Sequence, residues 1–340
     1  MDARIKDVAR LAGVSVTSVS RVLNNSEHVS PKLERKVRDA INQLRYSPSF
    51  IAKSLKRSKT NLIGVIIPDV TSSYMAMVLS RIEELASGNG YNLLISNIVE
   101  DTDKVVKYLN VYEEMRVDGI VLMHGKANDD IRTFLERTSI PVVVHADMGV
   151  HVPAVYIDNF HAAYDATSYL IRKGHTRIAH IAGQISEVAD ARHRYEGFMA
   201  ACADSAIAVD TGLIRFGDYK LRSGYDRMGE LLDAASGTFT ALFAASDDMA
   251  AGAINCMHDR GLAVPGDISV IGFDGTYIAD VVRPRLTTIR QPIGEIGEKT
   301  MQLLLAFIEQ RTDEQLSTRR IVLKHELIEK DSCCSIDGRG

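Results

Sequence analysis

The sequence has no tryptophan, only four cysteines, and no apolar run of the roughly 18 residues that a membrane-spanning helix needs. The cysteines are Cys202, Cys256, Cys333 and Cys334, which form neither a CxxC pair nor the dense pattern of a secreted disulfide scaffold. The start of the chain also lacks the apolar segment of a secretory signal. We therefore expect reduced thiols, no membrane partner and a cytoplasmic location.

Motifs for several enzyme classes are absent as well. The chain contains no GxxxxGK[ST], GxGxxG, GxSxG or HExxH segment, and its ten histidines do not cluster with cysteines at metal-ligand spacing. We interpret lone histidines such as His124, His145, His175 and His180 as hydrogen-bonded structural groups. The prediction is a protein that is not an enzyme and uses no cofactor or metal. A sugar-converting enzyme is the alternative, but no nucleophile or acid–base pair supports it.

Charge is distributed unevenly along the chain, whose formal net charge is −4. Residues 1–60 contain 13 lysines and arginines against five acidic residues, a net charge of +8, and the remainder carries −12. A basic arm joined to an acidic body suggests that only the arm contacts a polyanion.

Helical periodicity alone characterises the first part of the chain. Apolar residues repeat at helical spacing over residues 5–12, Gly13 interrupts the pattern, and a second apolar stripe covers residues 16–23. Ser15 is placed to cap the second helix, because its hydroxyl can accept a hydrogen bond from an unpaired N–H of the first turn. These features predict two short helices joined by a turn.

A third helix is predicted from the segment SPKLE onward. Ser30 stands at the cap position, Pro31 at the first helical position, and apolar residues continue at helical spacing to Leu44. The first 46 residues are therefore predicted to form three helices around a small core.

The second of these helices is the predicted DNA-reading helix. A helix held across its neighbour by a glycine-containing turn can place its outer side chains in the major groove, where base edges present a readable pattern of donors and acceptors. The predicted contacts are Val16, Thr17 and Arg21 with the bases, and Ser15, Ser20 and Asn24 with phosphates. A three-helix packing module without DNA is the alternative, and the charge of +8 argues against it.

From residue 61 the pattern changes to alternating strands and helices. The predicted strands are residues 62–67, 91–96, 119–123, 141–145, 154–158, 177–182, 241–245 and 268–273. Because these strands are apolar with few polar interruptions, they favour doubly wound parallel sheets covered by helices on both faces. About 270 residues is long for one such sheet, so we expect two α/β lobes, with a ligand at the carboxyl ends of the strands.

Motifs in both the headpiece and the body match the pattern of one protein family. The headpiece reads IKDVARLAGVSVTSVSRVLNNSEHVSPKLERKVRDAINQLRYSPSFIAKSL, and the body contains GVIIPD, VDGIVLM, IDN, LIRKGHTRIAHIAG, RYEGF, FAASDDMAAGA, GLAVPGDISVIGFD and PRLTTIRQP in this order. This pattern resembles the LacI/GalR family of bacterial transcriptional regulators over essentially the whole chain, and overall it is similar to catabolite-control-type members. The resemblance implies a helix-turn-helix headpiece followed by a two-lobed periplasmic-binding-protein-like domain.

Domain boundaries follow from the resemblance. The implied parts are a headpiece at residues 1–46, a hinge helix and linker at 47–60, an effector-binding and dimerisation body at 61–331, and a tail at 332–340. The implied N-lobe comprises 61–160 and 292–323, and the implied C-lobe comprises 161–291 and 324–331.

The segment after the headpiece is ambiguous by itself, being too short for a core and too apolar for a plain linker. In the family it forms a hinge helix, and the resemblance assigns to Leu55 a wedge in the minor groove that unstacks a base step and bends the duplex. Ala52 and Lys53 would lie beside it, and His28 completes the predicted DNA contacts.

The effector-binding residues are implied motif by motif. They are Asp69, Ser73, Tyr74, Arg194, Tyr219, Asp247 and Asp274. Their chemistry suits a polyol, since carboxylates accept hydrogen bonds from sugar hydroxyls, a guanidinium donates in a fixed fork, and an aromatic face stacks on the ring.

The resulting hypothesis is a homodimeric regulator, expected to act as a repressor, that binds a palindromic double-stranded DNA operator. A small-molecule effector, a sugar or sugar derivative, is expected between the lobes. The resemblance leaves open a tetramer, a phosphorylated co-regulator protein, and purines or nucleosides as effectors. A solute-binding protein that feeds a transporter is the alternative from another class, and the basic headpiece argues against it.

Overall fold

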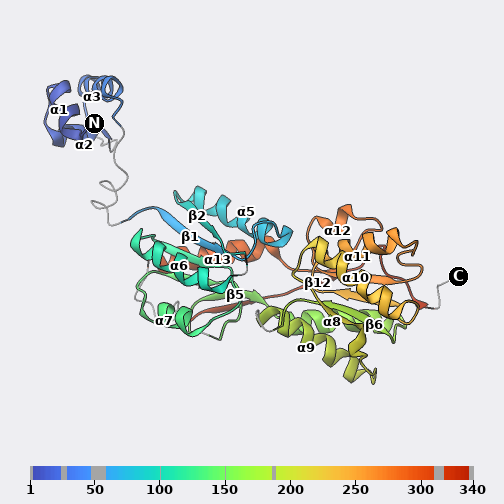
Figure 1. Cartoon of the computed structure of the whole chain (residues 1–340). Coiled ribbons are helices and arrows are strands. Elements are labelled where there is room, and N and C mark those ends of the chain that lie inside the picture. The colour runs from blue at the N-terminus through green and yellow to red at the C-terminus, as the bar shows by residue number, and fades with distance from the viewer. Residues whose placement is uncertain are drawn as a thin grey trace. The chain divides into compact units, whose positions relative to one another are not determined.

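The computed structural model describes residues 3–23, 29–46, 59–99, 101–149, 151–185, 189–309 and 318–336. Contacts divide the chain into two compact units, residues 1–60 and 61–340 (Figure 1). We refer to the three-helix part of the first unit as the headpiece and to the second unit as the body.

The headpiece contains helices α1 (Ile5–Ala12), α2 (Val16–Leu23) and α3 (Pro31–Leu44). Gly13 has a φ of 64°, the left-handed conformation that ends α1 and opens the turn into α2. The two predicted caps are present: Ser15 Oγ accepts from the N–H of Ser18 at 3.1 Å, and Ser30 Oγ accepts from the N–H of Leu33 at 3.3 Å. Val8, Val19 and Val37 from the three helices are fully buried in the core.

The N-lobe of the body has a six-stranded sheet in the order β11-β5-β4-β3-β1-β2, with every pair parallel. The strands are β1 (Leu62–Ile67), β2 (Asn92–Asn97), β3 (Gly119–Leu122), β4 (Val142–Val144), β5 (Ala154–Ile157) and β11 (Arg320–Leu323). Its helices are α5 (Ser73–Gly88), α6 (Thr102–Glu114), α7 (Asp129–Arg137) and α13 (Ile293–Glu309).

Both faces of this sheet are buried, which explains the uninterrupted apolar sequence of β1. Val65 and Ile67 belong to a core cluster shared with Val78 of α5, whereas Ile66 packs in a second cluster with Leu109 of α6. Alternate residues of a strand point to opposite faces, so helices on both sides require apolar residues at every position.

The C-lobe has a second six-stranded sheet in the order β12-β10-β9-β8-β6-β7. Its strands are β6 (Ile178–Ala182), β7 (Ile214–Phe216), β8 (Ala241–Ala244), β9 (Ser269–Asp274), β10 (Thr287–Arg290) and β12 (Glu326–Ile328). Its helices are α8 (Asn159–Arg172), α9 (Ala189–Asp204), α10 (Leu221–Ala235), α11 (Asp247–Asp259) and α12 (Ile278–Val281), with a 3₁₀ turn η1 (Thr211–Leu213). Helices α8 and α9 pack against each other, as do α10 and α11.

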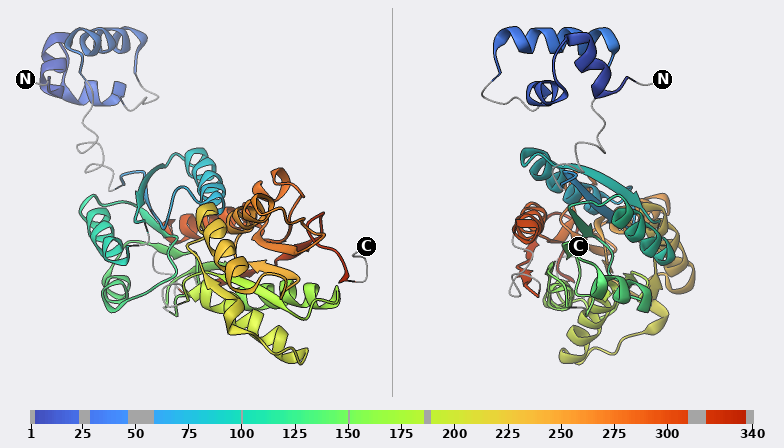
Figure 2. Two further views of the ribbon diagram at one scale, coloured as in Figure 1. Left: turned by 45° about the vertical axis from the view of Figure 1, so that its right-hand side comes forward. Right: turned by 90° about the vertical axis from the view of Figure 1, so that its left-hand side faces the viewer.

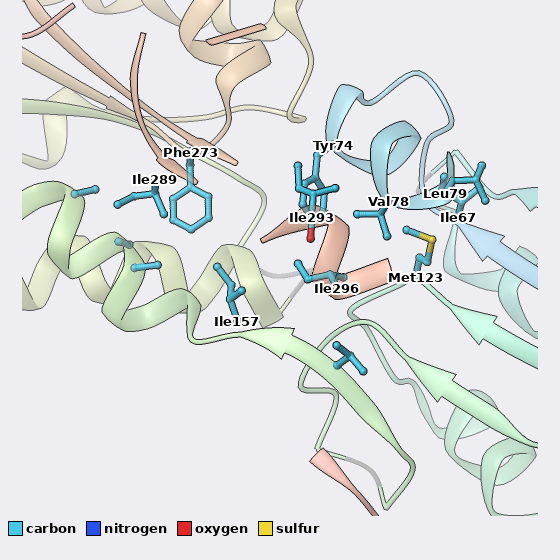
Figure 3. Packing of buried hydrophobic residues seen from close by; sticks show 14 of the residues in the cluster. Ile67, Tyr74, Val78, Leu79, Met123, Ile157, Phe273, Ile289, Ile293 and Ile296 are labelled. Atoms are coloured by element: carbon cyan, nitrogen blue, oxygen red, sulfur yellow. The ribbon is translucent and has the colours of Figure 1, made fainter. Parts of the chain in front are cut away.

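The chain passes between the lobes three times within the body. The passages lie between β5 and α8, between β10 and α13, and between β11 and β12 (Figures 1 and 2). One apolar cluster continues through this region. Figure 3 shows Tyr74, Ile293 and Ile296 between a group that contains Phe273 and Ile289 and another that contains Val78 and Met123.

Eight strands predicted from the sequence are confirmed to within one residue at each end. The sequence did not reveal β7, β10, β11 or β12. The predicted parallel sheets are confirmed except at one edge, where β12 pairs antiparallel with β10. β12 has only three residues and follows β11 after a two-residue connection, so it joins the edge of the sheet as a mixed-sheet strand often does. No helix in the described part of the chain is long and apolar enough to cross a membrane.

Candidate functional site

The exposed face of α2 carries the side chains predicted to read DNA bases. Val16, Thr17 and Arg21 are exposed, while Val19 and Val22 on the opposite face are buried in the headpiece core. Val16 is 40% exposed, which is unusual for a valine and suits contact with a thymine methyl group. The structure therefore presents these three residues on one accessible surface.

Of the remaining predicted DNA contacts, only Ser15 and Ser20 belong to the described residues. Ser15 is exposed and Ser20 is half-buried. The other five predicted contacts, namely Asn24, His28, Ala52, Lys53 and Leu55, lie outside the described residues.

A cavity of about 1180 Å³, including its mouth, lies between the two lobes of the body. Its lining is built largely from residues at the carboxyl ends of the parallel strands, where ligands bind in open α/β sheets. Asp69, His124 and His145 follow β1, β3 and β4 of the N-lobe, while Asp274 ends β9 of the C-lobe.

An arginine and an aspartate form the buried polar centre of the cavity. Arg194 of α9 is 6% exposed, and its Nη1 lies 3.4 Å from Oδ1 of Asp274. Its Nε donates to Asn159 Oδ1 at 2.8 Å, and Nη1 also donates to the carbonyl of Ala245 at 2.7 Å. The guanidinium lies 3.7 Å from the ring centroid of Phe273, so its orientation is fixed on several sides.

Asp274 is held in a strained backbone conformation with a φ of 116°. Gly275 follows with a φ of 71°, and this pair turns the chain away from the end of β9. Residues in sparsely populated backbone regions cluster at functional sites, where surrounding contacts maintain them. Burial raises the pKa of Asp274 to about 7, although the Arg194 guanidinium opposes the shift.

The N-lobe contributes a tyrosine–histidine pair. Tyr74 Oη lies 2.8 Å from His145 Nε2 and 3.0 Å from Gln291 Oε1. Burial lowers the pKa of His145 to about 4, so the ring is neutral at pH 7. Because His145 Nδ1 faces the carbonyl of Val155 at 3.0 Å, the proton is on Nδ1 and Nε2 accepts from Tyr74.

Among the polar contacts that join the lobes directly are a salt bridge and a side-chain hydrogen bond. Lys220 Nζ of the C-lobe lies 2.9 Å from Asp69 Oδ2 of the N-lobe, and Ser73 Oγ donates to Asp248 Oδ2. Separation of the lobes would have to break both contacts.

Five of the seven predicted effector residues line the cavity: Asp69, Tyr74, Arg194, Tyr219 and Asp274. Ser73 and Asp247 are not among its lining residues. The Ser73 hydroxyl donates a hydrogen bond to Asp248. Asp247 is fully buried, and its carboxyl group accepts hydrogen bonds from the N–H of Thr276 at 2.7 Å and from Thr288 Oγ1 at 2.6 Å. The effector role of all seven stays a prediction.

Sequence reasoning missed many lining residues, and His124, His145, Asp190 and Gln291 are among the polar ones. Interpretation of the two histidines as structural groups overlooked their position, since both come at the carboxyl ends of predicted strands. That position was the signal that could have found them.

Comparison with known proteins gives a matching family model for the headpiece and another for the body. The family model for bacterial regulatory proteins of the lacI family matches residues 4–49, and a periplasmic binding protein-like domain matches residues 167–333. Catabolite control protein A of Priestia megaterium is 37% identical over 314 residues, which cover 92% of this chain and 94% of that protein. The chain belongs to the LacI family.

Other LacI-family proteins are similar over nearly the whole chain. The regulator RegA of Clostridium saccharobutylicum is 35% identical over 334 residues, covering 98% of this chain and 99% of that protein. A structure of the Lac repressor dimer bound to operator and an anti-inducer aligns with a TM-score of 0.85 at 26% identity, covering 98% of this chain and 100% of that one. A complex of the regulator CelR with cellobiose aligns with a TM-score of 0.70 at 30% identity, covering 97% and 99%.

Membership of the LacI family makes the protein a DNA-binding transcriptional regulator with a ligand-binding domain. The resemblance predicted from the sequence is thereby confirmed, as is the helix-turn-helix headpiece joined to a periplasmic-binding-like body.

Proposed function

We propose that this LacI-family protein is a homodimeric repressor that binds a palindromic operator and is controlled by a sugar or sugar derivative bound between the lobes. The observation that carries the proposal is the cavity, because its polar residues come from both lobes. A ligand that contacts Arg194 and Asp274 on one side and Tyr74 on the other must favour one arrangement of the lobes over another. Only such unequal affinity for two states lets a ligand act as a switch.

The cavity has the chemistry of a polyol site. Asp274 supplies carboxylate acceptors, Arg194 a fixed set of donors, and Tyr219 an aromatic ring against which a sugar can stack. Cellobiose in the complex of the similar regulator CelR supports a carbohydrate effector here. Repressors among the relatives, such as PurR of Actinobacillus pleuropneumoniae at 38% identity, support repression as the output.

Recognition of the operator is tested by Arg21→Ala. The variant is expected to weaken binding to a selected palindromic duplex by about 1 to 3 kcal/mol, because an arginine that forms bidentate bonds with a guanine carries sequence preference. Fluorescence anisotropy at one fixed salt concentration, with the selected duplex and a scrambled one, measures the difference. Arg35→Ala, which removes the same charge from the exposed surface of α3, is the matched control. Equal weakening on both duplexes by Arg21→Ala would contradict a base-reading role.

A surface for the second copy is offered by exposed apolar side chains on one side of the body. Val70 and Val99 follow the neighbouring strands β1 and β2, and they are 44% and 57% exposed. On the C-lobe, Tyr277 and Val281 beside and within α12 are 56% and 61% exposed. Figure 1 shows β2, α5 and α12 along the same side of the body. A second copy that covered these side chains would remove apolar surface from water, which favours association.

Dimerisation is tested by Val281→Asp. Burial of a charge in the contact is expected to shift the protein to a monomer at micromolar concentration and to weaken operator binding at least about tenfold, since each half-site then binds alone. Analytical ultracentrifugation and anisotropy measure the two effects. Val322→Asp is the control, because Val322 is 56% exposed on β11, at the opposite edge of the N-lobe sheet from β2. A Val281→Asp protein that stays dimeric would rule this surface out.

A further inference from the structure

The cationic side chains that line the cavity are all engaged by groups of the protein. Among the described lining residues these are Arg194 and Lys220. Arg194 donates to Asn159 and to the carbonyl of Ala245 and pairs with Asp274, while Lys220 pairs with Asp69. An arriving anion would therefore have to compete with these existing partners.

Carboxyl groups outnumber these cations in the lining. Asp69, Asp190, Asp218 and Asp274 all line the cavity. Asp69 and Asp274 have cationic partners, and Asp218 Oδ1 accepts from the N–H of Lys220 at 3.1 Å. Asp190, in the first turn of α9, accepts no hydrogen bond from a described residue. Within the described part of the chain nothing occupies this carboxyl group, so a ligand hydroxyl group can donate to it.

A histidine on the opposite lobe also has one ring nitrogen without a hydrogen-bond partner in the described part of the chain. His124 is 4% exposed and lines the cavity, and its Nε2 has no hydrogen-bond partner among the described residues. Burial and the nearby Lys126 lower the pKa of His124 to about 4, so it is neutral at pH 7. Buried polar groups are nearly always hydrogen-bonded, and an exception calls for a partner. A neutral ring offers one donor and one acceptor, which matches a hydroxyl group.

We propose that the cavity selects an uncharged sugar over its phosphorylated form, and that Asp190 and His124 bind the hydroxyl groups of the ligand. The inference rests on the proposed function and narrows its effector class. A phosphate ester adds a charge of about −1.5 to −2 at pH 7. In this cavity it would meet cations that already have partners and four carboxyl groups, of which Asp274 is charged only in part at pH 7 because burial raises its pKa to about 7. The low dielectric of a buried site strengthens the repulsion from the charged carboxylates.

The experiment measures binding to the full-length protein by isothermal titration calorimetry and thermal shift. The probes are cellobiose, lactose, maltose, glucose and galactose, each monosaccharide being compared with its 6-phosphate. We expect at least one uncharged sugar to bind, and a phosphate ester to bind at least tenfold more weakly than its parent. A phosphate ester that binds as tightly as its parent, or more tightly, would overturn the inference.

Variants of α9 test the assigned contact. Asp190→Asn should weaken binding of the uncharged sugar at least tenfold and reduce its advantage over the phosphate ester, since a negative charge is lost. Glu196→Gln removes a charge from the exposed face of the same helix and should change neither value. His124→Gln should weaken binding of the uncharged sugar without changing the charge of the cavity. Unchanged affinity in Asp190→Asn would refute its role.

A measurement of operator binding by the same protein distinguishes failure of this inference from failure of the proposed function. If no probe of either form binds while the protein still binds its selected operator, the sugar effector of the proposed function fails, and the inference fails with it. If a phosphate ester binds best, the proposed function stands and only the selection of uncharged sugars is overturned.

Discussion

Replacement of Arg194 by leucine is expected to lower the free energy of unfolding of the body by about 3 to 5 kcal/mol and to abolish control of operator binding by the effector. The substitution leaves Asp274, which is 4% exposed, without its cation, and removal of one partner of a buried ion pair costs about this much. It also removes the donors that hold Asn159 and the carbonyl of Ala245. Chemical denaturation, and operator titrations with and without a sugar, measure the two effects.

The matched control for this substitution is Arg192→Leu. Arg192 lies on the same helix but is exposed, with one long hydrogen bond of 3.4 Å to the carbonyl of Ile185. Its replacement should cost less than about 1 kcal/mol, as surface substitutions usually do. A comparable loss of stability in both variants would show that the Arg194 effect belongs to helix α9 in general and not to the buried pair.

The contribution of two buried carboxyl groups to the stability of the body is expected to fall as the pH rises from about 4 to about 8. It sets the trend above about pH 7, where His124 and His145 are largely neutral in both the folded and the unfolded state. Burial raises the pKa of Asp247 to about 8, with a further contribution from Asp274, and the pKa of Asp274 is also raised, to about 7. In the unfolded chain both groups lose their protons near pH 4, whereas the folded protein keeps them to higher pH. The unfolded state is then favoured by up to about 1.4 kcal/mol per pH unit for each group. Denaturant titrations at pH 5, 6, 7 and 8 measure the slope.

The contribution of Asp247 is isolated by Asp247→Asn. An asparagine can still accept from the N–H of Thr276 and can donate to Thr288 Oγ1, so the variant should fold and show a shallower pH dependence. Asp259→Asn, at the exposed end of the same helix, should leave the slope unchanged. A free energy of unfolding that is flat or rises between pH 7 and pH 8 would contradict the raised pKa values.

Much of the fold follows from local pattern. β1 was predicted with its observed ends because six consecutive apolar residues fill both faces of a central parallel strand. β11 and β12 were missed for the converse reason, since all their residues are exposed or half-buried and they lie at the edges of the two sheets. An edge strand needs few apolar residues, so its sequence is hard to distinguish from a loop.

The candidate site was predictable only where a motif or a strand end indicated it. Arg194 and Asp274 were named from the segments RYEGF and GFDG, and both line the cavity. Asp247 was named in the same way, but its carboxylate is used by Thr276 and Thr288 within the C-lobe. No sequence pattern states whether a carboxylate at the start of a helix faces a ligand or its own protein. The pairing of Lys220 with Asp69 likewise depends on how two lobes face each other, which neither segment encodes locally.

The three passages between the lobes also determine the order in which the body can be completed during synthesis. β11 belongs to the N-lobe sheet but follows β1 by about 260 residues, and the whole C-lobe sheet except β12 is made in between. A ribosome adds about 5 to 20 residues per second. Roughly ten to thirty seconds therefore pass between the synthesis of β5 and that of β11, the strand that pairs with its edge. Until then the N-lobe exposes an unpaired edge to neighbouring nascent chains, which makes this interval the period of greatest risk of aggregation.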